Sequence, residues 1–171
     1  MEHFLAHALQ ALYGIKRHEA DQIVKSLTII HPYGKIGELD MGVPFGNDGR
    51  PNADYFHLAG RIKTYTEQME EGDTLAKIRS EAERAACIVF LGFSYLEQNM
   101  TLLRPQKKID RKPIFGTAYN MSSHDRDIVK QQLLSLFANA QLAERKKLVE
   151  LNTEIKCADL FDFYARSLNA Q

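Results

Sequence analysis

The sequence predicts an α/β fold, a parallel sheet of a few strands covered by helices in a Rossmann-like arrangement. Three short apolar runs, at 27–30, 87–91 and 113–117, predict strands, and the continuous run at 87–91 is typical of a strand that is buried on both faces. Each run ends in a turn, and a segment with helical spacing of apolar residues follows farther along the chain. This alternation of strand and helix favours parallel strands joined by crossover helices.

The first part of the chain predicts two helices before the first strand. Apolar side chains recur at i, i+3 and i+4 over 2–13, and Gly14 is expected to end that helix. A second helix is predicted over 17–25. Residues 41–54 are dense in Gly, Pro, Asn and Asp, which indicates a loop, and a further amphipathic helix is predicted over 74–86.

The stretch "CIVFLGFSYLEQNMTLL" has the clearest strand–turn–helix pattern. The run at 87–91 predicts a buried strand, and Gly92 and Phe93 form the turn. Ser94 stands three residues before Glu97, which is the spacing of a capping box, so Ser94 is predicted to cap the next helix.

The rest of the chain continues the alternation. A third strand is predicted over 113–117, and a serine-capped helix over 125–137. The charged segment 141–151 is predicted to be helical, and 155–168 is predicted to form a last amphipathic helix.

Glycines and polar residues follow all three predicted strands. His31 and Gly34 follow the first, Gly92 to Ser94 the second, and Gly116 with Thr117 end the third. Because ligands bind outside the carboxyl ends of parallel strands, we expect one site at this edge of the sheet.

Length and composition limit the possible classes of protein. With 171 residues the chain is expected to form one domain, and 22 basic against 22 acidic residues give no overall attraction to nucleic acid. No apolar run approaches the ~18 residues of a membrane span. Cys87 and Cys157 lie outside any CxxC spacing, and the amino terminus does not read as a signal peptide, so a cytoplasmic protein with reduced cysteines is expected.

Four segments together resemble the carboxyl-terminal half of a sirtuin-like domain, of the divergent bacterial branch often found in antiphage defence proteins. The segments are "MEHFLAHALQALYG", "TIIHPYGKIG", "CIVFLGFSYLEQNMTLL" and "KPIFGTAYNMS". The resemblance covers roughly residues 1–137 and depends on the order and spacing of the motifs.

The resemblance implies an NAD cofactor and a hydrolase of the NAD glycohydrolase or deacylase type. His31 matches the family's catalytic histidine, which acts as a general base on the nicotinamide ribose. The cofactor-binding positions that it implies are Gly34, Gly92, Phe93, Ser94, Gly116 and Thr117.

The sequence departs from this family in two ways. Pro32 and Tyr33 separate His31 from the glycine, and the family's first strand, Gly-Ala-Gly turn and asparagine motif have no counterpart before the first helix. Residues 1–171 are therefore interpreted as a single sirtuin-like domain that lacks its amino-terminal half, incomplete or inactive as it stands. Such a chain is expected to form a homo-oligomer or to pair with a second chain that supplies the missing half.

Other interpretations remain open at this point. The chain could be a non-catalytic interaction module that oligomerises through an exposed sheet edge, or an unrelated α/β regulator that binds another nucleotide. His31 could equally be a residue hydrogen-bonded to backbone, and Gly92 to Ser94 an ordinary turn. His3 and His7 have the i, i+4 spacing of a chelate but no evident third ligand, so no metal site is expected.

Overall fold

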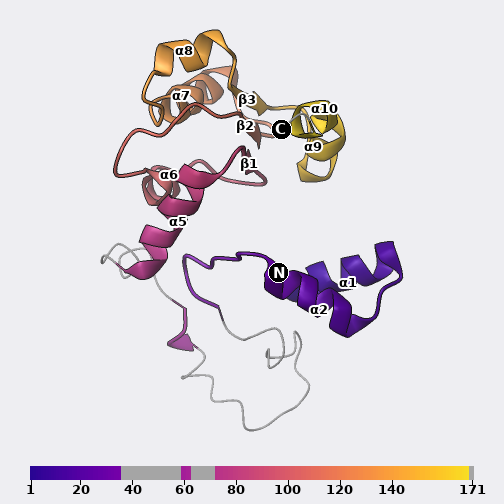
Figure 1. Ribbon diagram of the computed structural model, residues 1–171. Helices are drawn as coiled ribbons and strands as arrows, with labels where there is room; N and C mark the ends of the chain where they lie inside the picture. Colours follow the sequence, from indigo (N-terminus) through magenta and orange to yellow (C-terminus); the bar gives the residue numbers. More distant parts are fainter. Residues whose placement is uncertain (36–58, 63–71, 170–171) are drawn as a thin grey trace. The chain divides into compact units, whose positions relative to one another are not determined.

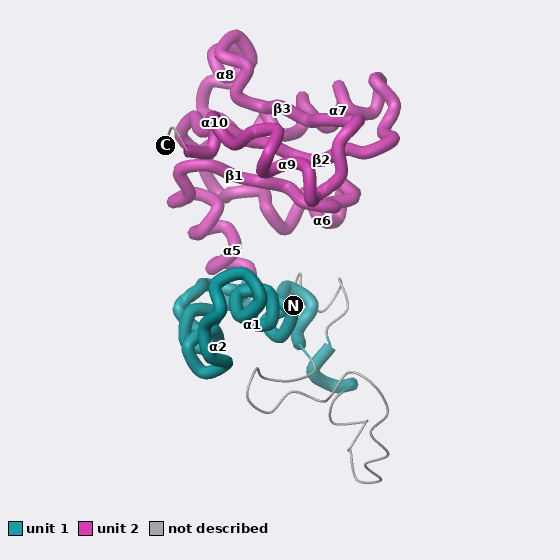
Figure 2. Tube along the Cα trace, turned by 90° about the vertical axis from the view of Figure 1, so that its right-hand side faces the viewer, with its two compact units in different colours: residues 1–74 teal, residues 75–171 magenta. Residues whose placement is uncertain are grey.

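The computed structural model describes residues 1–35, 59–62 and 72–169, which form parts of two compact units, Met1–Thr74 and Leu75–Gln171 (Figure 2). Each unit is described here by itself. The loop expected at 41–54 lies outside the described residues, and the assignment of the whole chain to one domain stays a prediction.

The amino-terminal unit begins with two helices, as the sequence predicts. Helix α1 spans Glu2–Tyr13 and α2 spans Arg17–Ser26. Gly14 ends α1 with a φ of 63°, a left-handed conformation that glycine adopts without steric cost. The small core between the helices consists of Ala6, Ala20 and Val24, with Leu9, Ile15 and Ile29 packed against it.

The predicted strand at 27–30 is wrong, because these residues pair with no strand in the described structure. The apolar character of the segment has another cause: Ile29 packs against the core of α1 and α2. The chain then turns, and the Gly34 amide donates to the His31 carbonyl at 3.1 Å. His-Pro-Tyr-Gly suits a β-turn, with proline second and glycine last.

The carboxyl-terminal unit contains the sheet (Figure 1). Strands β1 (Ile88–Phe90), β2 (Ile114–Thr117) and β3 (Val149–Asn152) are all parallel and lie in the order β1-β2-β3. The predicted α/β class with a parallel sheet is therefore confirmed. The first two strands are those predicted from the apolar runs.

Strand β3 replaces the second half of the helix expected over 141–151. Helix α8 ends at Arg145, and Lys147 adopts a positive φ of 51° before the strand begins. The charged character of this segment reflects its place at the edge of the sheet, since Glu150 is exposed while Val149 is buried. The sequence pattern was ambiguous because this strand exposes Glu150 on one face while it buries Val149 on the other.

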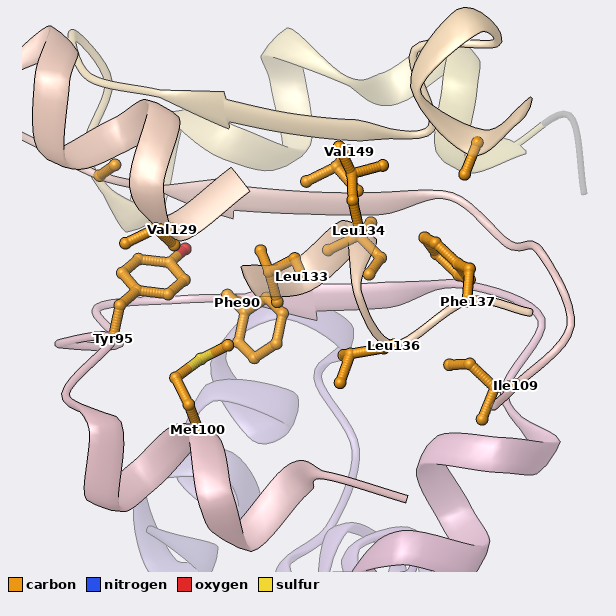
Figure 3. Packing of buried hydrophobic residues seen from close by; sticks show 13 residues of the cluster. Phe90, Tyr95, Met100, Ile109, Val129, Leu133, Leu134, Leu136, Phe137 and Val149 are labelled. Carbon is orange, nitrogen blue, oxygen red and sulfur yellow. The ribbon is translucent and has the colours of Figure 1, made fainter. Parts of the chain in front are cut away.

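Helices cover both faces of the sheet. Phe90 and Ile114 belong to the main core with residues of α6 and α7, and Figure 3 shows side chains of this cluster meeting. Phe115 points to the opposite face, since side chains alternate along a strand, and it packs there against Leu160 of α9. The helices of this part of the chain are α5 (Asp73–Arg84), α6 (Glu97–Leu103), α7 (Ser123–Leu134), α8 (Ala140–Arg145), α9 (Cys157–Phe163) and α10 (Ala165–Asn169).

Two of these helices have ends that the sequence partly anticipated. Ser122 caps α7, and its hydroxyl accepts from the Asp125 amide at 3.0 Å. The single helix expected over 155–168 is instead divided at Tyr164 into α9 and α10.

Candidate functional site

The described part of the carboxyl-terminal unit has an open pocket of about 870 Å³ at the carboxyl ends of its parallel strands. Its walls come from the segments 92–95 after β1, 118–121 after β2, and 156–158, which follow β3 and begin α9. Thr117 and two residues of α7, Asp125 and Val129, complete it. This is the edge at which the sequence predicts a site, and the volume lies in the range of small-molecule pockets.

Gly92 and Thr117, both predicted as site residues, are joined in the wall of this pocket. Gly92 has a φ of 58°, and its amide donates to the Thr117 hydroxyl at 3.0 Å. Cys157 lies beside both: its Sγ is 3.9 Å from the Thr117 hydroxyl, and 3.4 Å from where a Cβ on Gly92 would lie. The hydrogen bond between Gly92 and Thr117 joins the turn after β1 to the end of β2. Because the Gly92 amide donates to Thr117, it is not available to a ligand.

Ser94 lines the pocket, but it does not cap α6 as the sequence predicts. The helix begins at Glu97 and its N-cap residue is Leu96, with no side-chain cap. The Ser94 hydroxyl instead accepts from the Asn99 side-chain amide at 3.0 Å. The helix begins later than predicted because Tyr95 has a positive φ of 53°, which is not helical. The Tyr95 ring is buried in the core.

Phe93 and Tyr95 form an aromatic cluster at the base of this turn. The Phe93 ring lies 5.0 Å from that of Phe90 and 5.3 Å from that of Tyr95, measured between centroids. The Tyr95 hydroxyl donates to the Thr117 carbonyl at 3.2 Å, and burial raises the pKa of this phenol, so the group stays a donor. The Phe93 ring therefore has a packing role, although the residue also borders the pocket.

Gly116 is buried within β2 and is absent from the pocket walls described above. A Cβ at this position would overlap the Tyr95 hydroxyl and would lie 2.9 Å from Cδ2 of Leu151. The space next to Gly116 is therefore filled by this protein's own side chains. The close packing of Tyr95 explains why this position is a glycine. The expected contact of Gly116 with a cofactor stays a prediction.

The rim of the pocket carries polar and aromatic groups that the sequence did not single out. Lys156 places its Nζ 5.2 Å from the centre of the Tyr119 ring, and Tyr119 is 50% exposed. Asp125 accepts a hydrogen bond from the Ser122 hydroxyl at 2.7 Å. The arrangement offers one cation, one accessible aromatic face and several hydroxyl or amide groups, which are the means to bind a planar ring attached to an anion.

His31 belongs to the amino-terminal unit, where it is paired with a carboxylate. Its Nε2 lies 2.9 Å from Oε1 of Glu2, the first residue of α1, and both side chains are partly buried. Hydrogen bonds hold the pKa of the Glu2 carboxyl below its ordinary value; the bond to its own backbone amide contributes most and the bond from His31 next. This pair ties the turn at 31–34 to the start of α1, which is a structural role.

We expect His31→Ala to raise the pKa of the Glu2 carboxyl toward its ordinary value. Because the pKa in the folded chain is lowered, this carboxyl stabilises the unit at neutral pH, and the contribution is lost as the pH falls through the lowered pKa. An NMR titration of the Glu2 side chain measures the shift. His18→Ala, at an exposed position of α2, is the control; an unchanged Glu2 pKa in His31→Ala would contradict the structural role.

Gly34 is also explained by local structure. It has a φ of 76° and forms an isolated antiparallel bridge with Ile62, and a Cβ there would collide with the Arg61 carbonyl. The requirement for glycine thus comes from this close backbone approach.

The imidazoles of His3 and His7 both contact a cationic side chain, the guanidinium of Arg17. The Arg17 guanidinium lies 3.1 Å from Nδ1 of His3 and 3.2 Å from Nε2 of His7, and it also donates to Asp21 at 2.7 Å. Among residues 1–35, 59–62 and 72–169 there is no group of three or more His, Cys, Asp or Glu side chains that could hold a metal ion. Nor does any helix in this part of the chain have the length and apolar character to cross a membrane.

The fold and the pocket define an α/β unit with a ligand-sized site at the carboxyl edge of a parallel sheet. Comparisons of the chain with protein-family models, curated proteins and solved structures found no match.

Proposed function

We propose that the carboxyl-terminal unit binds NAD, or a nucleotide that shares its adenosine phosphate portion, in the pocket at the carboxyl edge of the sheet. The observation that carries this proposal is the convergence of the three segments that follow β1, β2 and β3 on one pocket of about 870 Å³. The resemblance to sirtuin-like domains supplies the choice of NAD as the first ligand.

The residues in the walls support some parts of a nucleotide better than others. Lys156 supplies a positive charge for a phosphate, and the exposed ring of Tyr119 supplies a surface for a base. In the turn after β1 the Gly92 amide already donates to the Thr117 hydroxyl, so it does not point a hydrogen at a pyrophosphate. The adenosine phosphate portion is therefore the better fit.

We propose binding without hydrolysis. The family's base corresponds to His31, whose imidazole is engaged with Glu2 in the amino-terminal unit. The described residues that line the pocket include no histidine or glutamate; their one carboxylate, Asp125, is hydrogen-bonded to Ser122. The described wall thus offers no histidine or glutamate as a general base for water or a ribose hydroxyl.

Calorimetry on the full chain tests this proposal with NAD, ADP-ribose and AMP as separate ligands. We expect heat from all three, and about tenfold weaker binding in Lys156→Gln, a loss of ~1.4 kcal/mol. Lys107→Gln is the matched control, because Lys107 is exposed and lies outside this pocket. The absence of heat with every ligand at ~1 mM, where even weak complexes form, would contradict the proposal.

A further inference from the structure

The described lining of the nucleotide pocket carries one basic and one acidic side chain, Lys156 and Asp125. These two charges cancel, so the described side chains give the pocket no net charge. A nucleotide phosphate, in contrast, carries about two negative charges at neutral pH. Since Lys156 is the described group that attracts this phosphate, the position of Asp125 determines how much further negative charge the pocket accepts.

The two charged side chains come from helices on opposite faces of the sheet. Asp125 lies in the first turn of α7, which packs on the face that carries Phe90. Lys156 is the N-cap residue of α9, which packs on the face that carries Phe115. A ligand in the pocket therefore meets the ammonium group on the α9 side and the carboxylate on the α7 side.

Local hydrogen bonds hold the Asp125 carboxylate at the amino end of α7. The Ser122 hydroxyl donates to its Oδ2 at 2.7 Å and accepts from the Asp125 amide at 3.0 Å. Among the residues that the structure describes, Asp125 forms no ion pair with a cationic side chain. A negative charge is favourable at a helix amino end, so Asp125 already occupies the place where α7 could otherwise attract a phosphate.

The α7 side of the pocket suits the uncharged part of a ligand. Met121, which precedes α7, and Val129, one turn beyond Asp125, are apolar and border the pocket. An anion placed near them would be repelled by the carboxylate, because charges closer than about 8–10 Å are only partly screened at physiological salt. The pocket thus has one favourable position for a phosphate, beside Lys156.

We propose that Asp125 sets the phosphate specificity of this pocket, so that AMP and NAD are accepted while ADP and ATP are disfavoured. The inference rests on the proposed nucleotide site. The phosphate of AMP and the pyrophosphate of NAD each carry about two negative charges, and every terminal phosphate added brings about one more. Lys156 is the one cation of the described lining, so the added charges meet the carboxylate with no second cation there to offset it. Repulsion of the wrong ligand is a general source of specificity.

Calorimetry on the full chain with AMP, ADP and ATP, in buffer without divalent cations, tests this proposal. In the unmodified chain we expect AMP to bind most tightly and ATP most weakly. Asp125→Asn removes the charge and keeps an oxygen that can accept from Ser122, so the affinity for ATP should rise about fivefold relative to that for AMP. Asp127→Asn makes the same change on α7 at an exposed position outside this pocket, and it should leave the ratio of the two affinities unchanged.

Ionic strength gives a second measurement of the same effect. The difference between Asp125→Asn and the unmodified chain should shrink as salt is added, because screening weakens the repulsion. An unmodified chain that binds ATP as tightly as AMP, or a ratio that Asp125→Asn does not change, overturns the role of Asp125 and leaves the nucleotide site standing. A chain that gives no heat with any of the three nucleotides overturns the nucleotide site, and this inference with it.

Discussion

Replacing Leu133 by alanine should destabilise the carboxyl-terminal unit by about 2–5 kcal/mol, the range for a buried leucine that leaves a cavity. Leu133 is fully buried on α7, in the cluster that packs against Phe90 of β1 and Val149 of β3. Figure 3 shows these side chains together. Replacing Leu133 therefore leaves a cavity in the core that includes residues of β1 and β3.

Ile128 on the same helix gives the matched control. Ile128 is an apolar residue of α7 like Leu133, but its side chain is 48% exposed. We therefore expect Ile128→Ala to change the free energy of unfolding by less than about 0.5 kcal/mol. Hydrogen exchange at the amides of β2 measures both variants within this unit, and equal effects of the two would contradict the assigned face of α7.

Replacing Gly116 by alanine should cost about 1–3 kcal/mol of stability, as overpacking of a close-packed core does. The added methyl group overlaps the Tyr95 hydroxyl and crowds Leu151. A glycine kept open for a cofactor would behave differently, because alanine there would weaken binding and leave the folded chain as stable as before.

A double-mutant cycle with Tyr95→Phe tests whether the collision with the Tyr95 hydroxyl causes the loss of stability in Gly116→Ala. Removing the hydroxyl deletes the atom that the new methyl group would meet, although it also removes the hydrogen bond to the Thr117 carbonyl. The double variant should therefore be more stable than the sum of the two single changes predicts, which denaturant unfolding measures. Additive effects would contradict the collision with Tyr95.

The strands that the sequence predicts correctly are those buried on both faces. The apolar runs that contain β1 and β2 have no other explanation in this fold, since helices cover the sheet on either side. The run at 27–30 has a similar composition, but it is apolar because Ile29 packs against the core between α1 and α2. An apolar run of four residues does not distinguish a strand from such a covering segment.

The sequence did not predict strand β3, and for this reason it also did not predict Lys156 and Cys157 as pocket residues. β3 carries the exposed Glu150 and reads as part of a charged helix, so the residues after it could not be assigned to the strand-end edge. Lys156 and Cys157 reach the pocket only because they follow β3. The strand-end rule predicts Gly92, Phe93, Ser94 and Thr117, which all border this pocket. The conformation of Tyr95, after which the helix begins at Glu97, depends on tertiary packing.

The most direct test of the central claim, a nucleotide site at the carboxyl edge of this sheet, is an NMR titration of the isotope-labelled full chain with NAD. We expect the amide signals of Gly92, Thr117, Tyr119 and Lys156 to shift together and to saturate along one binding curve. Signals that stay unchanged at these four positions, or shifts confined to the amino-terminal unit, would contradict the claim.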